Sequence, residues 1–86
     1  MKKFIVQESE GGLEKLGGMP VLVFAMNYIY AGVLSGVNDS FIELTDAKIV
    51  YETGPFGSRG YKDAQPLPGG VWNIQRSAIE SFGPGK

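Results

Sequence analysis

The sequence predicts an all-β fold: a small, strongly bent five-stranded barrel after a short N-terminal helix, in one domain over residues 1–86. Val, Ile, Phe and Tyr dominate residues 21–50, and β-branched and aromatic side chains favour strands. Gly, Asn, Asp and Pro separate the apolar runs, as turn residues do. Glycines also stand inside one predicted strand, where they allow the sharp bend that a small barrel requires.

A short helix is predicted within residues 9–17, because Leu13 and Leu16 have helical spacing. Glycine pairs bracket these leucines so closely that only one or two turns can form. The first strand is predicted over residues 20–26, followed by a turn at Met26–Asn27.

The second strand is predicted over residues 28–37 and does not alternate cleanly between apolar and polar residues. We therefore expect both of its faces to be covered, one by the core and the other by a neighbouring subunit. Gly32 and Gly36 lie inside it, and such glycines favour a bend or a close approach of another backbone.

The third strand, predicted over residues 40–53, contains a change of phase. Leu44 belongs to one face, whereas Ala47 has the opposite parity. A β-bulge near Asp46 would bring both side chains to the core.

The C-terminal third is predicted to contain a long loop and two short strands. Residues 54–70 are rich in Gly and Pro and have little to bury, which is typical of a loop. A fourth strand is expected over residues 71–75 and a last strand over residues 79–82, joined at Arg76–Ser77. Residues 83–86 are expected to be a flexible tail.

Composition excludes several classes of site. The chain has no Cys and no His, which removes disulfides, zinc sites and the common nucleophile–base pairs, so we expect no catalysis and no cofactor. Asp39, Glu43 and Asp46 lie near one another in sequence, but a solvated strand face explains them better than a metal site. Glycines between 54 and 60 lack the Gly-Lys-Ser/Thr ending of a phosphate loop.

Charge and hydropathy indicate a cytoplasmic protein with a local binding site. No apolar run approaches the roughly 20 residues of a membrane span, and no signal peptide is evident. Eight Lys and Arg against nine Asp and Glu give a net charge of -1, so no overall positive field attracts polyanions. Any nucleic acid must therefore be held by a local site.

The segment from Tyr30 to Ala47 resembles the Sm-like family, whose barrels are SH3-like in form. Its stretch from Tyr30 to Asn38 is similar to the family's first motif, aromatic-x-Gly-x-Leu-x-Gly-x-Asp, with Asn38 at the aspartate. The stretch Ile42–Ala47 resembles the Leu-x-Leu-x-Asp-Ala ending of that motif, although the segment before Asp46 is one residue shorter. Ile74–Ser77 resembles the second motif, apolar-x-Arg-Gly, with Ser77 at the glycine.

This resemblance implies a homo-oligomeric ring, in which the fourth strand of one subunit pairs with the fifth strand of the next. Such pairing would also cover the edge strands of a domain too small to be very stable alone. The resemblance places bases in pockets between two loops. The implied nucleic-acid-binding residues are Asn38, Asp39, Ser40, Phe41, Gln75, Arg76 and Ser77.

A structural explanation of the same residues stays open. Asn38–Asp39 suits a turn, Phe41 could belong to the core, and Arg76 could pair with Glu80 or another surface acid.

The loop of residues 54–70 supplies a second set of candidate contacts, in which basic and aromatic residues alternate. This pattern is typical of segments that follow single strands, although such a loop can also be merely mobile. The candidates are Phe56, Arg59, Tyr61 and Lys62.

These observations predict a non-catalytic Sm-like ring that binds single-stranded RNA or DNA. The rival hypothesis is a protein-interaction or assembly module with a small SH3-like or OB-like barrel, which the slightly acidic composition favours.

Overall fold

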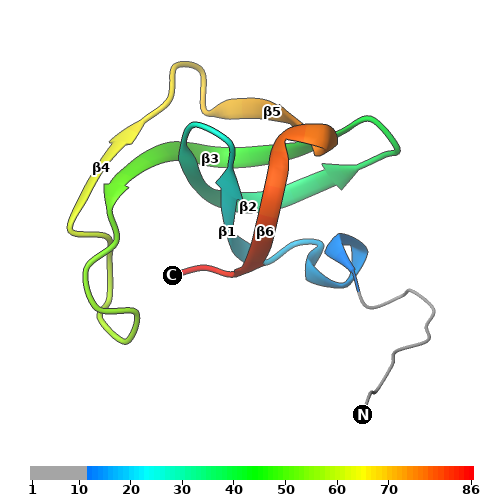
Figure 1. Ribbon diagram of the computed structural model, residues 1–86. Helices are drawn as coiled ribbons and strands as arrows, with labels where there is room; N and C mark the ends of the chain where they lie inside the picture. The colour runs from blue at the N-terminus through cyan, green and yellow to red at the C-terminus, as the bar shows by residue number, and fades with distance from the viewer. Residues whose placement is uncertain (1–11) are drawn as a thin grey trace, which may run out of the picture.

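The computed structural model describes residues 12–86, which form one antiparallel sheet of six strands (Figure 1). The strands are Pro20–Ala25 (β1), Ile29–Val37 (β2), Phe41–Glu52 (β3), Asp63–Pro66 (β4), Val71–Gln75 (β5) and Ile79–Pro84 (β6). The order across the sheet is β4-β3-β2-β1-β6, and β5 also pairs with β3. The predicted β class is confirmed. The count of five strands is wrong, and no ladder among the described strands closes the sheet into a barrel.

The long curved strand β3 organises the sheet, because β2 pairs along one of its edges while β5 and β4 share the other edge (Figure 1). Its pairing with β2 shifts between Thr45, opposite Val33, and Lys48, opposite Ala31. Asp46, at the shift, has a left-handed φ of 53°. The predicted bulge near Asp46 is thus confirmed, and it brings both Leu44 and Ala47 into the core.

Gly32 lies opposite this bulge, where the backbone of β3 lies close to that of β2. A Cβ atom at Gly32 would lie 2.8 Å from the carbonyl oxygen of Thr45 and 3.1 Å from Cβ of Leu44. Only glycine leaves room for this contact. At Gly36 in the same strand the nearest atom would be 3.5 Å away, an ordinary contact distance.

The segment 54–70, predicted to be one long loop, contains the strand β4. The residues Asp63–Pro66 have little β propensity, but their backbone pairs with β3 from Lys48 to Glu52. β4 and β5 follow one another along the same edge of β3, separated by a turn in which Gly69 and Gly70 have positive φ. The strand predicted as the fourth, residues 71–75, is therefore β5, and it pairs with β3 along the same edge as β4.

The ends of the described chain also differ from prediction. The N-terminal helix is a 3-10 helix over Leu13–Leu16 (η2), and the first predicted residues, 9–11, lie outside the described residues. The predicted joint at Arg76–Ser77 is a second 3-10 helix, Arg76–Ala78 (η3). Residues 83 and 84 belong to β6 rather than to a tail, and Lys86 is held by hydrogen bonds. No helix of residues 12–86 is long and apolar enough to span a membrane.

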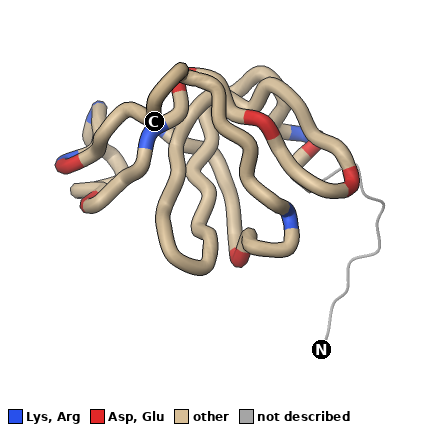
Figure 2. Tube along the Cα trace, turned by 90° about the horizontal axis from the view of Figure 1, so that it is seen from above, with Lys and Arg blue, Asp and Glu red and all other residues tan. Residues whose placement is uncertain are grey.

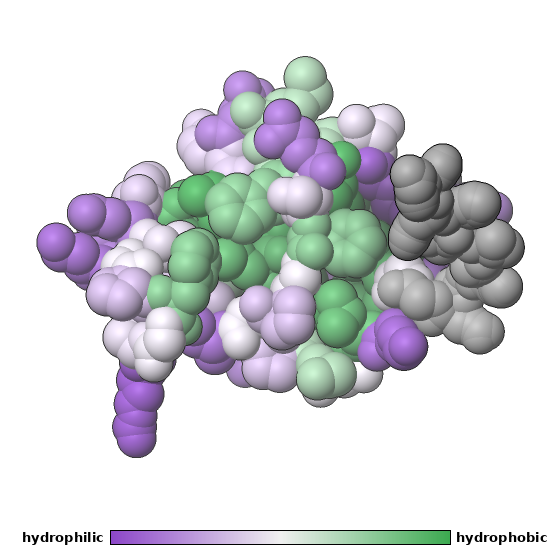
Figure 3. Space-filling view, turned by 60° about the horizontal axis from the view of Figure 1, so that its bottom comes forward, coloured by the Kyte–Doolittle hydropathy of each residue, from purple (hydrophilic) through white to green (hydrophobic). Residues whose placement is uncertain are grey.

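Apolar side chains pack on both faces of the sheet, and the covering of one face of the second strand by another subunit stays a prediction. The larger cluster of buried residues contains Leu13, Val21, Val23, Leu34, Ile42, Leu44, Ala47 and Ile74. A smaller cluster contains Leu22, Ala31 and Val50. One side of the molecule also shows a continuous apolar area with polar residues at its margins (Figure 3). Several large apolar side chains therefore remain available for contacts with other molecules.

Substitution of Gly32 by Ala should lower the free energy of unfolding by roughly 1 to 3 kcal/mol, because the added methyl group collides with backbone that cannot easily move. Gly36→Ala is the matched control in the same strand and should cost clearly less. Urea unfolding followed by circular dichroism measures both. Equal losses for the two variants would contradict the close approach of β2 and β3 at Gly32.

Candidate nucleic-acid interface

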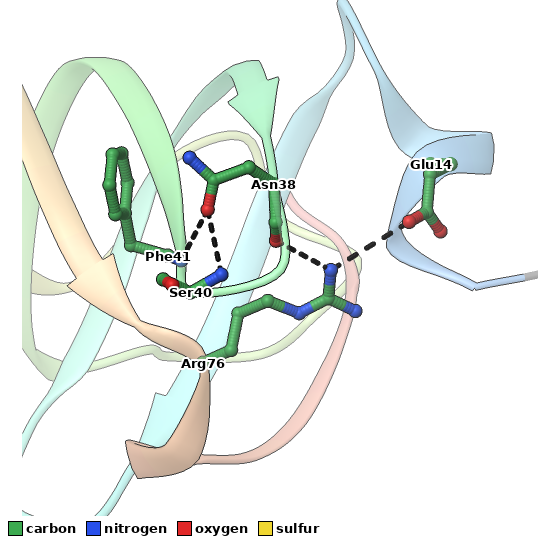
Figure 4. Close-up of polar contacts among 5 residues, drawn as sticks. All are labelled: Glu14, Asn38, Ser40, Phe41 and Arg76. Carbon is green, nitrogen blue, oxygen red and sulfur yellow. Dashed lines mark hydrogen bonds and ion pairs between the residues drawn. The ribbon is translucent and has the colours of Figure 1, made fainter.

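The loop between β2 and β3 is a tight turn organised by the side chain of Asn38 (Figure 4). Its Oδ1 accepts hydrogen bonds from the backbone amides of Ser40, at 2.7 Å, and Phe41, at 2.8 Å. The amide of Asn38 donates to the carbonyl of Phe41 at 3.0 Å. Because Oδ1 of Asn38 already accepts two hydrogen bonds within the turn, the turn explains this side-chain oxygen without a bound base.

Arg76, at the start of η3, holds this turn against the end of β5 (Figure 4). Its Nη1 donates to the carbonyl of Asn38 at 2.9 Å, and its backbone amide donates to the carbonyl of Ser40 at 2.9 Å. Nη1 also lies 3.7 Å from Oε2 of Glu14, so the acid that pairs with Arg76 is on η2 and is not Glu80. The loop of residues 38–41 and the segment of residues 75–77, between which the resemblance places bases, are therefore in contact.

The remaining predicted residues of this site lie at the surface around Arg76. Phe41 pairs with Gln75 across β3 and β5, and it is 38% exposed. Asp39, Gln75 and Ser77 are exposed. This end of β3 thus carries an exposed aromatic residue, Phe41, and on the other side of the turn the guanidinium of Arg76, and bases stack on groups of both kinds.

A second site lies toward the opposite end of β3, where a groove of about 520 Å³ runs between the loop after β3, β4 and Lys48. Its lining includes the predicted residues Arg59, Tyr61 and Lys62. Lys48 and Lys86 also line it, against a single acid, Asp63. Four of the eight Lys and Arg residues of the chain therefore border one groove.

Of the four cations around this groove, one forms an ion pair within residues 12–86. Lys62 forms one ion pair, at 3.8 Å, with Glu52, and both side chains are largely exposed, so this pair is weak. Figure 2 shows basic and acidic positions interspersed on the segments beside the C-terminal end of the chain. The groove can accept an anion that reaches more than one of these cations.

Phe56, the fourth residue predicted in this loop, does not line the groove. Its side chain is 69% exposed, and its ring lies 6.0 Å from Nζ of Lys86. Lys48 and Lys86 were missed by the sequence argument. Lys48 sits in a strand, where no loop signal marks it, and Lys86 was assigned to the tail.

An aromatic hollow at the β1–β2 turn was also not predicted. Met26, Tyr28 and Tyr30 line a cavity of about 270 Å³ that extends to Gln75 of the first site. The Tyr28 and Tyr30 rings meet edge to face, with centroids 6.1 Å apart. Partial burial, and secondarily the nearby Tyr28, raises the pKa of Tyr30 above its usual 10.0.

Within residues 12–86 there is no group of three or more acidic, His or Cys side chains that could hold a metal ion. Glu43 instead accepts a hydrogen bond from Oγ of Ser35 at 2.8 Å. The sequence matches no protein-family model and no curated protein.

Asn38→Ala should remove both side-chain bonds of the turn and lower the free energy of unfolding by about 1 kcal/mol. Asn38→Asp keeps an oxygen acceptor in the same place and should retain most of the stability. Thermal unfolding of the two variants measures the difference. If Asp is as destabilising as Ala, the bonds from Oδ1 do not stabilise the turn.

Proposed function

We propose that this protein is a non-catalytic, Sm-like ring protein that binds single-stranded RNA or DNA. The observation that carries the proposal is the groove bordered by Lys48, Arg59, Lys62 and Lys86. A chain with a net charge of -1 has no overall field to attract a polyanion, so it needs a concentrated local site. The groove supplies such a site.

The groove and the Arg76 site suit different parts of a nucleic acid. The Lys and Arg side chains of the groove suit phosphates, which require positive charge without a fixed pattern of donors. The exposed side chain of Phe41 suits bases, for which stacking contributes about 1 to 3 kcal/mol each. The two sites lie toward opposite ends of β3, so a strand could cross the surface between them.

The edges of the sheet support assembly into a ring. In the described sheet β5 pairs only with β3, and β6 pairs only with β1, which leaves one edge of each strand for another subunit. Val71 on β5 is 50% exposed and Phe82 on β6 is 40% exposed. Pairing of β5 with β6 of the next subunit would bury both and match the arrangement that the resemblance implies.

Docking of another protein is the second candidate function. It is favoured by the cluster at the β1–β2 turn, where the exposed fractions are 72% for Met26, 51% for Tyr28 and 56% for Tyr51. Met and Tyr are typical of protein interfaces. A pull-down that recovers a protein partner and no nucleic acid would favour this candidate.

Binding of short U-rich and A-rich oligonucleotides should be detectable at low salt with a dissociation constant well below about 100 μM. Lys62→Gln should weaken binding of all sequences alike and reduce the slope of log K against log salt by about 1, because one phosphate contact is lost. Lys15→Gln makes the same charge change on η2, outside the groove, and is the control. Fluorescence anisotropy over a salt series measures both. Equal effects of the two variants would show that the groove is not the site, and absence of binding would refute nucleic-acid recognition.

The molar mass in solution should be a multiple of the 9.3 kDa subunit. Phe82→Glu places a charge on the proposed contact and should reduce the mass to that of the subunit, because an unpaired charge at an apolar interface is costly. Light scattering with the 260/280 nm absorbance ratio of fresh protein reports assembly and copurified nucleic acid together. A monomer for the unsubstituted protein would refute the ring.

A further inference from the structure

The ammonium group of Lys86 lies in a ring of oxygen atoms made by the loop that follows β3. Nζ donates to the carbonyls of Pro55 and Gly60, each at 2.8 Å, and to the carbonyl of Thr53 at 2.9 Å. The hydroxyl of Ser58 is a fourth neighbour, at 3.2 Å. Four oxygen atoms around one nitrogen satisfy all three N–H donors of an ammonium group.

Aromatic rings complete this enclosure. Nζ lies 4.9 Å from the ring centroid of Tyr61 and 6.0 Å from that of Phe56, within the range of cation–π attraction. Among the described residues no Asp or Glu forms an ion pair with Lys86. The positive charge is therefore held by carbonyl dipoles and ring faces rather than by a carboxylate.

The backbone is shaped to bring Lys86 to this position. A Cβ atom at Gly85 would lie 2.7 Å from the carbonyl carbon of Val21 and 2.9 Å from Oη of Tyr61, so only glycine passes between them. The amide of Gly85 donates to the carbonyl of Pro20 at 2.9 Å, and the amide of Lys86 donates to Oη of Tyr61 at 3.0 Å. Three consecutive contacts, from two backbone amides and one side chain, thus fasten residues 85 and 86.

The loop that follows β3 has its own turn and internal hydrogen bonds, which direct its carbonyl oxygens toward the ammonium group. Gly54 has a left-handed φ of 72°, which turns the chain back after β3. The amide and hydroxyl of Ser58 both bond to the carbonyl of Pro55, at 3.1 and 2.8 Å. Carbonyl oxygens that converge in this way repel one another unless a cation lies between them.

The geometry points to residues 53–61 as a binding site for a primary ammonium group, filled by Lys86 of the same chain. Ligands of this class carry an N–H₃⁺ head on a narrow stem, as lysine side chains and small alkylammonium ions do. A quaternary ammonium has no N–H to donate, and a guanidinium presents its donors in a rigid planar fork rather than on a compact head. Withdrawal of Lys86 leaves a site that an external primary ammonium can fill, and because Gly60 and Tyr61 also border the basic groove, its occupancy controls the shape of that groove.

Chemical rescue tests this site. Lys86→Ala should lower the melting temperature by roughly 5 °C. Methylammonium chloride should restore at least half of that loss, rising with concentration as mass action requires. The same concentrations should leave the unsubstituted protein unchanged, because its site is filled. Tetramethylammonium chloride at equal ionic strength should restore nothing.

Lys62→Ala is the matched control, since Lys62 belongs to the same segment, is exposed and makes only a weak ion pair. It should lose little stability, and methylammonium should not affect it. An unchanged melting temperature for Lys86→Ala, or equal rescue by the two ammonium salts, would overturn the proposal.

A second measurement uses the unsubstituted protein and does not depend on how the variant folds. Protons of an exposed ammonium group exchange rapidly with water, whereas hydrogen-bonded protons are protected. The side-chain ¹H–¹⁵N spectrum should therefore show a protected ammonium signal that disappears in Lys86→Met. Its absence from the spectrum of the unsubstituted protein would also overturn the proposal.

Discussion

The contact between Gly32 and the bulge of β3 is the constraint on which the rest of the structure depends. Because no side chain separates the strands there, β2 and β3 approach closely enough for the sheet to bend. The bulge also turns the backbone groups of Ala47 outward, where its amide bonds to the carbonyl of Gly70 and its carbonyl accepts from Leu67. These two bonds hold the turn that separates β4 from β5. One extra residue in β3 therefore fixes both the curvature of the sheet and the break in its edge beside the basic groove.

Side-chain patterns in the sequence predicted the elements that bury apolar residues. The boundaries of β5 match the prediction because Trp72 and Ile74 alternate with polar residues, and the bulge near Asp46 followed from the phase change in β3. β4 was missed because Asp63–Pro66 has no such alternation; its order comes from backbone pairing with β3. A strand stabilised in this way leaves no trace in hydrophobic periodicity.

The two candidate sites, like the fold, were predictable only in part from the sequence. The meeting of Asn38 with Arg76 followed from the resemblance of two motifs that lie far apart in the sequence, and the loop of basic and aromatic residues indicated part of the groove. The positions of Lys48 and Lys86 in the groove could not be predicted. Lys48 lies at the groove because β4 pairs with β3 at this residue. Lys86 lies there because backbone carbonyls of the loop after β3 bind its ammonium group, and residue types alone reveal neither arrangement.

The basic residues of the described chain differ in the groups that surround their charges. Arg76 is used internally, where it links Asn38 to Glu14, so its charge is partly cancelled by a carboxylate. Lys86 is also used internally, but only neutral carbonyls and rings surround it, so its full positive charge remains at the border of the groove. Such a charge is already fixed in place and loses little side-chain entropy when an anion binds, unlike the exposed Lys62. The ammonium site thus gives a protein of net negative charge a preorganised positive point beside the basic groove.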